Sequence, residues 1–218
     1  MEAVKRNAVA EIYKTLGIDA VIEFGISVDA LANVGSWLGE RIGLEEAIAI
    51  IPKLQEERNS LFYLNMIGAF LYKHGVSVIT YLNLNAFEPN VRALVLKQAP
   101  FTEDLLMLIP KYLRGNERLF WGSVRISPYG ARSGKYDVTT VVRTLLEYNR
   151  APTAIMIVGR NLPKIEVDDA LIAELLFQGP KDTQDESLDP YSVRGLIKHL
   201  QESQSMDIGM LSELEFIY

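Results

Sequence analysis

Apolar residues recur at helical spacing along most of the chain. In the first segment Val4, Ala8, Ile12 and Leu16 fall on one face of a helix that Gly17 would end. The same spacing continues through eight further segments, residues 27–43, 44–51, 60–75, 90–99, 102–115, 135–149, 166–179 and 191–204. The pattern predicts a mainly α protein of stacked helical hairpins, with residues 60–75, apolar nearly all round, as the central helix.

Two short segments leave the choice between strand and helix open. Residues 76–85 alternate β-branched and aromatic residues with polar ones, and residues 151–159 form a short apolar run. The glycine- and proline-rich residues 117–134 are expected to be largely loop. We therefore expect at most a small β element within one compact domain. Its helical body covers residues 1–180, and residues 181–218 add an acidic linker, a terminal helix and a docking tail.

An internal similarity relates residues 45–63 to residues 103–121, which align without a gap at a separation of 58 residues. Pro52 aligns with Pro110, and a Leu-Phe pair follows each proline at the same distance. Because proline removes a backbone donor and clashes with the preceding turn, the alignment predicts matching kinks in a degenerate helical repeat. Chance similarity between two amphipathic helices is the alternative.

Stacked helices combined with the sequence "LFWGSVRIS" at residues 119–127 resemble the RNA-binding helical-repeat modules of Ro proteins. The resemblance covers residues 59–149 at most, and several landmarks of that family are missing downstream. It implies a helical RNA-binding fold and transfers no individual contact residue.

The composition is that of an ordinary globular protein. Lys and Arg number 22 against 28 Asp and Glu, and the net charge of −6 argues against attraction of the whole surface to nucleic acid or anionic membranes. The absence of cysteine excludes disulfides, thiolate nucleophiles and cysteine-based metal sites, and is most simply compatible with the cytosol. No apolar run approaches the roughly 20 residues that span a bilayer. We expect a soluble, cytoplasmic protein without a membrane partner.

Residues 111–164 reverse this charge locally. Ten Lys and Arg against three acidic residues give +7, which leaves −13 for the rest of the chain. Aromatic residues lie among the cations, a combination in which bases stack on rings while cations neutralise phosphates. Tyr129 and Tyr136 are expected to be exposed in the glycine-rich loop, and Phe120 and Trp121 to belong to the core. The predicted nucleic-acid contacts are Arg118, Arg125, Tyr129, Arg132, Ser133, Lys135, Tyr136 and Arg143.

The chemical motifs are weak. Residues 130–137, "GARSGKYD", have one residue too few between the glycines for a nucleotide-hydrolysing phosphate loop, and a tyrosine follows the lysine. A generic phosphate contact by Arg132, Ser133 and Lys135 fits better. The two imidazoles, His74 and His199, are each expected near a helix C-terminus, where a cation is stabilised without any catalytic role. We assign no catalytic residue, no metal and no cofactor.

The sequence favours a non-enzymatic binding or assembly protein whose basic aromatic loop contacts a polyanion, most simply single-stranded RNA or DNA. The alternative is a self-assembling structural or scaffold subunit, viral ones included. In that case residues 165–218, with a net charge of −9, would dock on the basic stretch of a neighbouring copy and form a homo-oligomer. An enzyme of unrecognised class is the third possibility, and a deep pocket around His74 or Lys135 would favour it.

Overall fold

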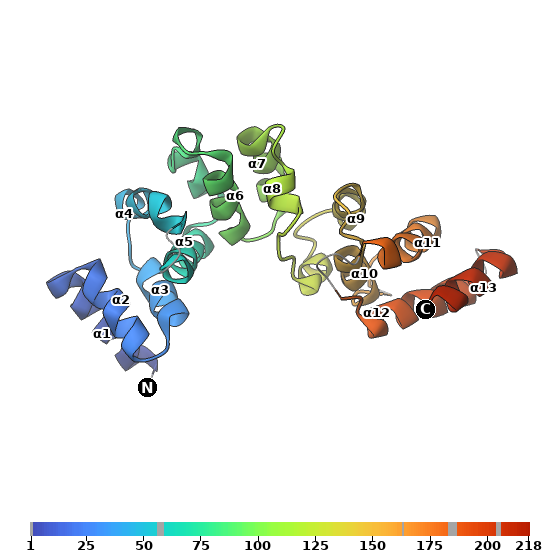
Figure 1. The fold of residues 1–218 in the computed structure, drawn as a ribbon, viewed down its shortest axis with the longest axis horizontal. Coiled ribbons are helices and arrows are strands. Elements are labelled where there is room, and N and C mark those ends of the chain that lie inside the picture. The colour runs from blue at the N-terminus through green and yellow to red at the C-terminus, as the bar shows by residue number, and fades with distance from the viewer. Residues whose placement is uncertain (1, 56–58, 163, 183–186, 204–205) are drawn as a thin grey trace. The chain divides into compact units, whose positions relative to one another are not determined.

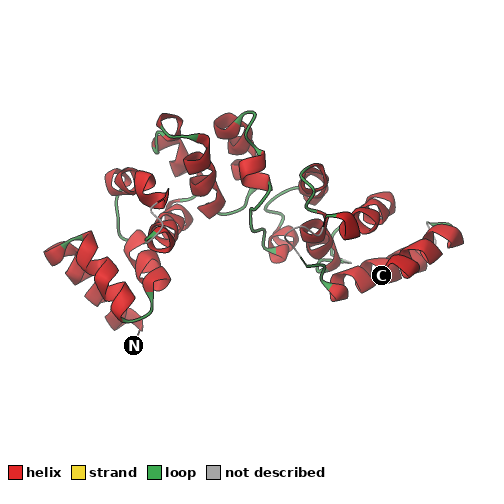
Figure 2. Cartoon of the chain, viewed as in Figure 1, coloured by secondary structure: helices red, strands yellow, loops and turns green. Residues whose placement is uncertain are grey.

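The computed structural model describes residues 2–55, 59–162, 164–182, 187–203 and 206–218. Every regular element in these ranges is an α-helix or a 3₁₀-helix (η), and they contain no strand (Figure 2). The prediction of a mainly α fold is confirmed. None of the described helices is long and apolar enough to cross a membrane.

The chain divides into two compact units, and the prediction of one domain stays a prediction. Unit 1 comprises residues 1–100 and 104–120, and unit 2 comprises residues 101–103 and 121–218. The predicted boundary at residue 180 falls inside unit 2. The division falls between Phe120 and Trp121. These two residues are 0% and 7% exposed, so both belong to the core as expected.

Unit 1 consists of short helices that follow one another along the chain (Figure 1). Its elements are α1 (Glu2–Leu16), α2 (Ile18–Ser27), α3 (Leu31–Gly39), α4 (Leu44–Ile50), η1 (Ile51–Gln55), α5 (Ser60–His74), η2 (Val76–Tyr81), η3 (Leu84–Ala86), α6 (Pro89–Gln98), α7 (Glu103–Leu113) and α8 (Arg118–Trp121). The first residue of α7 and the last residue of α8 belong to unit 2.

Helix α5 forms the core of unit 1, as its all-round apolar sequence predicts. Its buried residues include Phe62, Met66 and Phe70, none more than 1% exposed. Helix α3 packs against α5 so closely that a Cβ atom at Gly35 would lie 2.4 Å from the Phe62 carbonyl oxygen. A Cβ atom at Gly39 would lie 2.1 Å from the Met66 carbonyl oxygen. Two glycines one helical turn apart therefore allow the two backbones to touch.

The strand considered for residues 76–85 is wrong, because this segment forms η2 and η3. Val76, Ile79 and Leu82 are buried at intervals of three residues, which is the repeat of a 3₁₀-helix. Val78, which a strand would place on the same face as Val76, is only half-buried. The spacing of the buried residues, rather than the β-branched composition, decides the conformation.

Unit 2 contains the remaining helices. They are η4 (Pro128–Ser133), α9 (Val138–Glu147), α10 (Ala151–Gly159), α11 (Asp169–Gln178), η5 (Gly179–Lys181), α12 (Pro190–Ser203) and α13 (Ile208–Ile217). The polar segment expected as a loop at residues 180–190 begins in η5, and its residues 183–186 lie outside the described residues.

The second strand candidate, residues 151–159, is also wrong. It forms α10, in which seven of nine residues are buried, with Pro152 in the first turn. Neighbouring helices and η4 cover α10, including α9, α11 and α12. A helix covered on most sides has a continuous apolar sequence without the periodicity of a surface helix, so the short run alone did not distinguish it from a buried strand.

The internal repeat stays a prediction. Pro52 lies in the 3₁₀-helix η1 that directly follows α4, whereas Pro110 lies inside α7. Phe62 and Phe120, aligned in the two copies, are both completely buried. Residues 56–58 of the first copy lie outside the described residues.

Candidate nucleic-acid interface

The predicted contact residues are divided between the two units. Arg118 is exposed on α8 in unit 1, and the other predicted contacts, from Arg125 to Arg143, belong to unit 2. Most of them lie on or beside η4, the 3₁₀-helix that interrupts the segment expected to be largely loop. The candidate site is therefore centred on η4.

Local sequence explains the form of η4. Pro128 occupies its first turn, where a missing N–H group has no cost, and Ser133 donates a 2.8 Å hydrogen bond to the Gly130 carbonyl. Gly134 ends the element with a φ of +63°, a left-handed conformation that favours glycine. Ahead of η4, the exposed Arg125 lies between two buried residues, Val124 and Ile126. The backbone of this entry segment thus turns Arg125 toward solvent.

Tyr136 is only 4% exposed, so the prediction that it lies on the surface is wrong. Its ring meets the Phe101 ring edge-to-face at 5.0 Å, and a Cβ atom at Gly130 would lie 3.1 Å from the Tyr136 ring. The Tyr136 hydroxyl has no hydrogen-bond partner, and burial raises its pKa to about 12. Tyr136 is therefore a core residue beneath η4 and is closed to a nucleobase.

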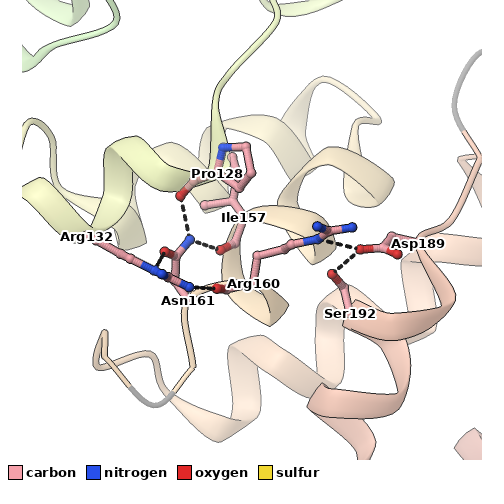
Figure 3. Close-up of polar contacts among 7 residues, drawn as sticks. All are labelled: Pro128, Arg132, Ile157, Arg160, Asn161, Asp189 and Ser192. Carbon is pink, nitrogen blue, oxygen red and sulfur yellow. Dashed lines mark hydrogen bonds and ion pairs between the residues drawn. The ribbon is translucent and has the colours of Figure 1, made fainter.

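Arg132 fixes η4 onto the end of α10 (Figure 3). Its Nε donates a 2.9 Å hydrogen bond to Oδ1 of Asn161, and its NH2 group donates to the Arg160 carbonyl. Asn161 is fully buried and donates from Nδ2 to the carbonyls of Pro128, at 2.6 Å, and Ile157, at 2.5 Å. One amide side chain thus joins the start of η4 to the last turn of α10.

A second polar contact joins α10 to α12 (Figure 3). Arg160 Nε lies 2.9 Å from Oδ2 of Asp189, which also accepts a 2.7 Å hydrogen bond from Ser192. The Ser192 hydrogen bond and then Arg160 lower the pKa of Asp189, so this carboxylate stays ionised at neutral pH. A Cβ atom at Gly159 would lie 2.6 Å from that of Ser192, so the two helices are in close contact.

Two exposed tyrosines lie beside these arginines. The Arg132 guanidinium carbon is 5.5 Å from the centre of the Tyr129 ring, and that of Arg160 is 6.0 Å from the centre of the Tyr191 ring. Tyr129 is 59% and Tyr191 74% exposed. Arg160 also interacts with Tyr129, which adds to the larger effect of Asp189 in raising the Arg160 pKa. We call Tyr129, Arg132, Arg160 and Tyr191 the tyrosine–arginine surface.

Sequence reasoning missed two members of this surface. Arg160 lies within the basic stretch but at a helix end, and Tyr191 lies outside the stretch, in the acidic third of the chain. The signal for Tyr191 was its place beside Pro190, in the first turn of α12, where no neighbouring turn covers a large ring. Its approach to Arg160 depends on the packing of α12 against α10.

The remaining predicted contacts differ in their surroundings. Lys135 is exposed and follows η4, with its carbonyl accepting a 2.8 Å hydrogen bond from the backbone of Glu103. Arg143 lines a cleft of about 320 Å³ on unit 2, together with Glu147, Glu174 and Asp182. Three carboxylates around one guanidinium make this cleft unfavourable for a phosphate. Lys135 is better placed than Arg143 to meet a polyanion.

The two imidazoles make contacts within other helix pairs or turns. His74 is the exposed last residue of α5, and its ring lies 4.7 Å from that of Phe70. His199 Nε2 lies 2.9 Å from Oδ1 of Asp169, which joins α12 to α11. In comparisons with known proteins, no family model, no curated protein and no solved structure matches the chain.

Proposed function

We propose that the protein binds single-stranded nucleic acid, RNA or DNA, without catalysis, through the tyrosine–arginine surface of unit 2. The observation that carries the proposal is the pair of exposed rings, Tyr129 and Tyr191, each with a guanidinium 5.5–6.0 Å from its centre. Unpaired bases stack on aromatic rings and on guanidinium planes, and the guanidinium charge attracts the neighbouring phosphate. A single-stranded nucleic acid supplies both the unpaired bases and the phosphates.

The hydrogen bonds of the two arginines support stacking more than phosphate binding. Arg132 and Arg160 already donate within the protein, so their planes are held in place while part of their hydrogen-bonding capacity is used. Phosphate neutralisation then falls mainly to Arg125 and Lys135, the exposed cations before and after η4. Because the whole chain carries −6, we expect weak binding with a strong dependence on salt.

The proposed contacts differ from those predicted from sequence. Arg125, Tyr129, Arg132, Ser133 and Lys135 are kept. Arg160 and Tyr191 are added because they complete the surface, and Tyr136 is withdrawn because it is buried. Arg143 is withdrawn because of its acidic neighbours, and Arg118 because it belongs to unit 1.

Fluorescence anisotropy with labelled poly-dT and poly-U oligonucleotides, titrated at several salt concentrations, tests the proposal. The double variant Arg125→Gln/Lys135→Gln should bind more weakly and with a flatter salt dependence, by roughly 0.7 in log–log slope for each lost phosphate contact. The matched control is Lys5→Gln/Arg114→Gln, which removes two exposed cations of unit 1 and gives the same net charge.

The control variant should keep the wild-type slope. Equal losses in both double variants would mean that binding follows net charge rather than the two cations that flank η4. No binding by the wild type at low salt would exclude the proposed function.

A further inference from the structure

Helix α13 exposes large apolar side chains on a face that none of the described residues of unit 2 covers. Ile208 is 83% and Phe216 92% exposed, and only Leu214 of the helix is buried. Ile208 and Phe216 lie about two turns apart on one side of the helix and form a short apolar stripe that the polar Ser212 interrupts. Large exposed apolar side chains on a surface helix are typical of a protein-binding surface.

The exposure of this stripe does not reflect an undocked helix. Leu214 is completely buried, and Gln201 of α12 donates a 2.6 Å hydrogen bond to Glu215. At the end of the helix the Tyr218 hydroxyl donates a 2.8 Å hydrogen bond to the Leu176 carbonyl of α11, and burial raises the Tyr218 pKa to about 12. Helix α13 is thus attached to both α11 and α12, with its apolar stripe outward.

A groove of about 670 Å³ lies between α12 and α13. Its apolar lining includes Leu188, Val193 and Ile197, and the exposed cations Arg194 and Lys198 lie at its side. This volume is within the range of grooves that accept large side chains of a partner. The groove therefore combines an apolar floor with an edge that carries Arg194 and Lys198, the latter paired with Glu202 at 3.5 Å, and one carboxylate, Glu215.

The outward surface of α13 has the complementary chemistry. The helix carries the exposed Glu213 and no Lys or Arg, and its Asp207 cap adds a carboxylate at the N-terminus, whereas Glu215 faces the groove of its own copy. We propose that the groove between α12 and α13 binds α13 of a second copy of this chain. Phe216 and Ile208 of one copy occupy the groove of the other, and Glu213 lies near Arg194 and Lys198.

The proposed contact is reciprocal, because each copy contributes one helix and one groove. Such an isologous pairing closes into a two-fold dimer and leaves no free site for further growth. One ten-residue helix from each copy gives a small interface, below about 1,200 Å². We therefore expect a dimer that dissociates on dilution, with a dissociation constant roughly in the micromolar range or weaker.

Sedimentation velocity over a wide range of protein concentrations, without nucleic acid, measures the association. Phe216→Asp and Arg194→Glu/Lys198→Glu should each raise the dissociation constant by about tenfold or more, because they change the two sides of one contact. Tyr72→Asp is the matched control, since Tyr72 is 80% exposed on unit 1 and should have no effect. All substituted side chains are exposed, so the fold should persist in every variant.

The absence of cysteine allows a direct test of geometry. A chain with Phe216→Cys mixed with a chain with Ile197→Cys should form a disulfide-linked heterodimer under mild oxidation, faster than either pairs with Tyr72→Cys. A wild type that stays monomeric at all concentrations overturns the proposal. A dimer that Phe216→Asp does not weaken, or equal cross-linking rates for all pairs, overturns it as well.

Discussion

The two units bury different kinds of side chain. The core of unit 1 is apolar, and its closest contact, between α3 and α5, depends on Gly35 and Gly39. Among the described residues the buried polar side chains all belong to unit 2, namely Arg150, Thr153, Asn161 and Ser192. In unit 1, α3 and α5 are in backbone contact, and the half-buried Arg92 donates to the carbonyls of Asn85, Phe87 and Tyr112. In unit 2 the side chains that make such hydrogen bonds are buried.

The buried polar side chains of unit 2 have a structural reason. In unit 2 the segment from the end of α8 to the start of η4 carries carbonyls that accept hydrogen bonds from buried side chains. Arg150 donates to the carbonyls of Trp121 and Val124, and Asn161 donates to that of Pro128. These bonds hold in one place the segment that carries Arg125, Tyr129 and Arg132. The proposed binding surface thus depends on polar side chains that bind no ligand themselves.

The largest expected effect is that of Asn161→Ala. The substitution removes three hydrogen bonds and leaves the Pro128 and Ile157 carbonyls buried without this donor, which should cost about 3–5 kcal/mol. Urea unfolding gives the loss of stability, and hydrogen exchange should place it in η4, α10 and α12. Asn33→Ala, at an exposed site on α3, is the control. Faster hydrogen exchange in unit 1 instead would show that Asn161 does not hold the helices of unit 2 together.

In unit 1 the corresponding change is Gly39→Ala. The new Cβ would lie 2.1 Å from the Met66 carbonyl oxygen, so α3 and α5 must separate, at a cost of about 1–3 kcal/mol. Hydrogen exchange should increase in α3 and α5. Gly43→Ala is the matched control, because its Cβ would meet only the Glu46 side chain at 3.7 Å. Equal stability of the two variants would show that the helices are not in backbone contact.

A smaller, pH-dependent effect is expected for Asp189→Asn. Since the pKa of Asp189 is lowered in the folded protein, its carboxylate stabilises the fold above the unfolded pKa of about 3.9. That stability is lost as the pH falls through the folded pKa. The variant should be less stable than wild type at pH 7, and the difference should shrink toward pH 3. Urea unfolding between pH 3 and pH 7 measures the free energy of unfolding of the variant and the wild type. Glu166→Gln, at an exposed site, is the control. A difference in stability that does not change with pH would argue against the ion pair.

The smallest effect should come from Tyr136→Phe. The hydroxyl is buried without a partner, so its removal should leave stability unchanged within about 1 kcal/mol or increase it slightly. The ring and its contact with Phe101 remain. Nucleic-acid binding should also be unchanged, in contrast to Tyr129→Ala, which should cost about 1–3 kcal/mol per stacked base. Anisotropy and thermal unfolding of both variants make the comparison.

The helices could be predicted from sequence where their apolar residues repeat on one side, as in α7 and α9. Residues 76–85 and 151–159 could not, because a 3₁₀-helix and a fully covered helix lack the spacing that separates helix from strand. At the site, Tyr129 and Tyr136 both have glycine and basic residues as near neighbours in sequence, so the sequence does not distinguish the exposed ring from the buried one. Phe101, distant in sequence, is what covers Tyr136. Likewise Tyr191 reaches Arg160 only through the packing of α12 on α10.

The proposed function depends on contact of a single strand with Tyr129 and Tyr191, on the surface that Arg132 and Asn161 hold in place. Ultraviolet cross-linking of an oligonucleotide containing 5-bromouracil, followed by mass spectrometry of the linked peptides, measures this contact. Cross-links are expected to the peptides that contain Tyr129 and Tyr191, with their loss in Tyr129→Ala/Tyr191→Ala and their retention in Tyr136→Phe. Cross-links confined to unit 1, or unchanged in the double variant, would contradict the proposed contact.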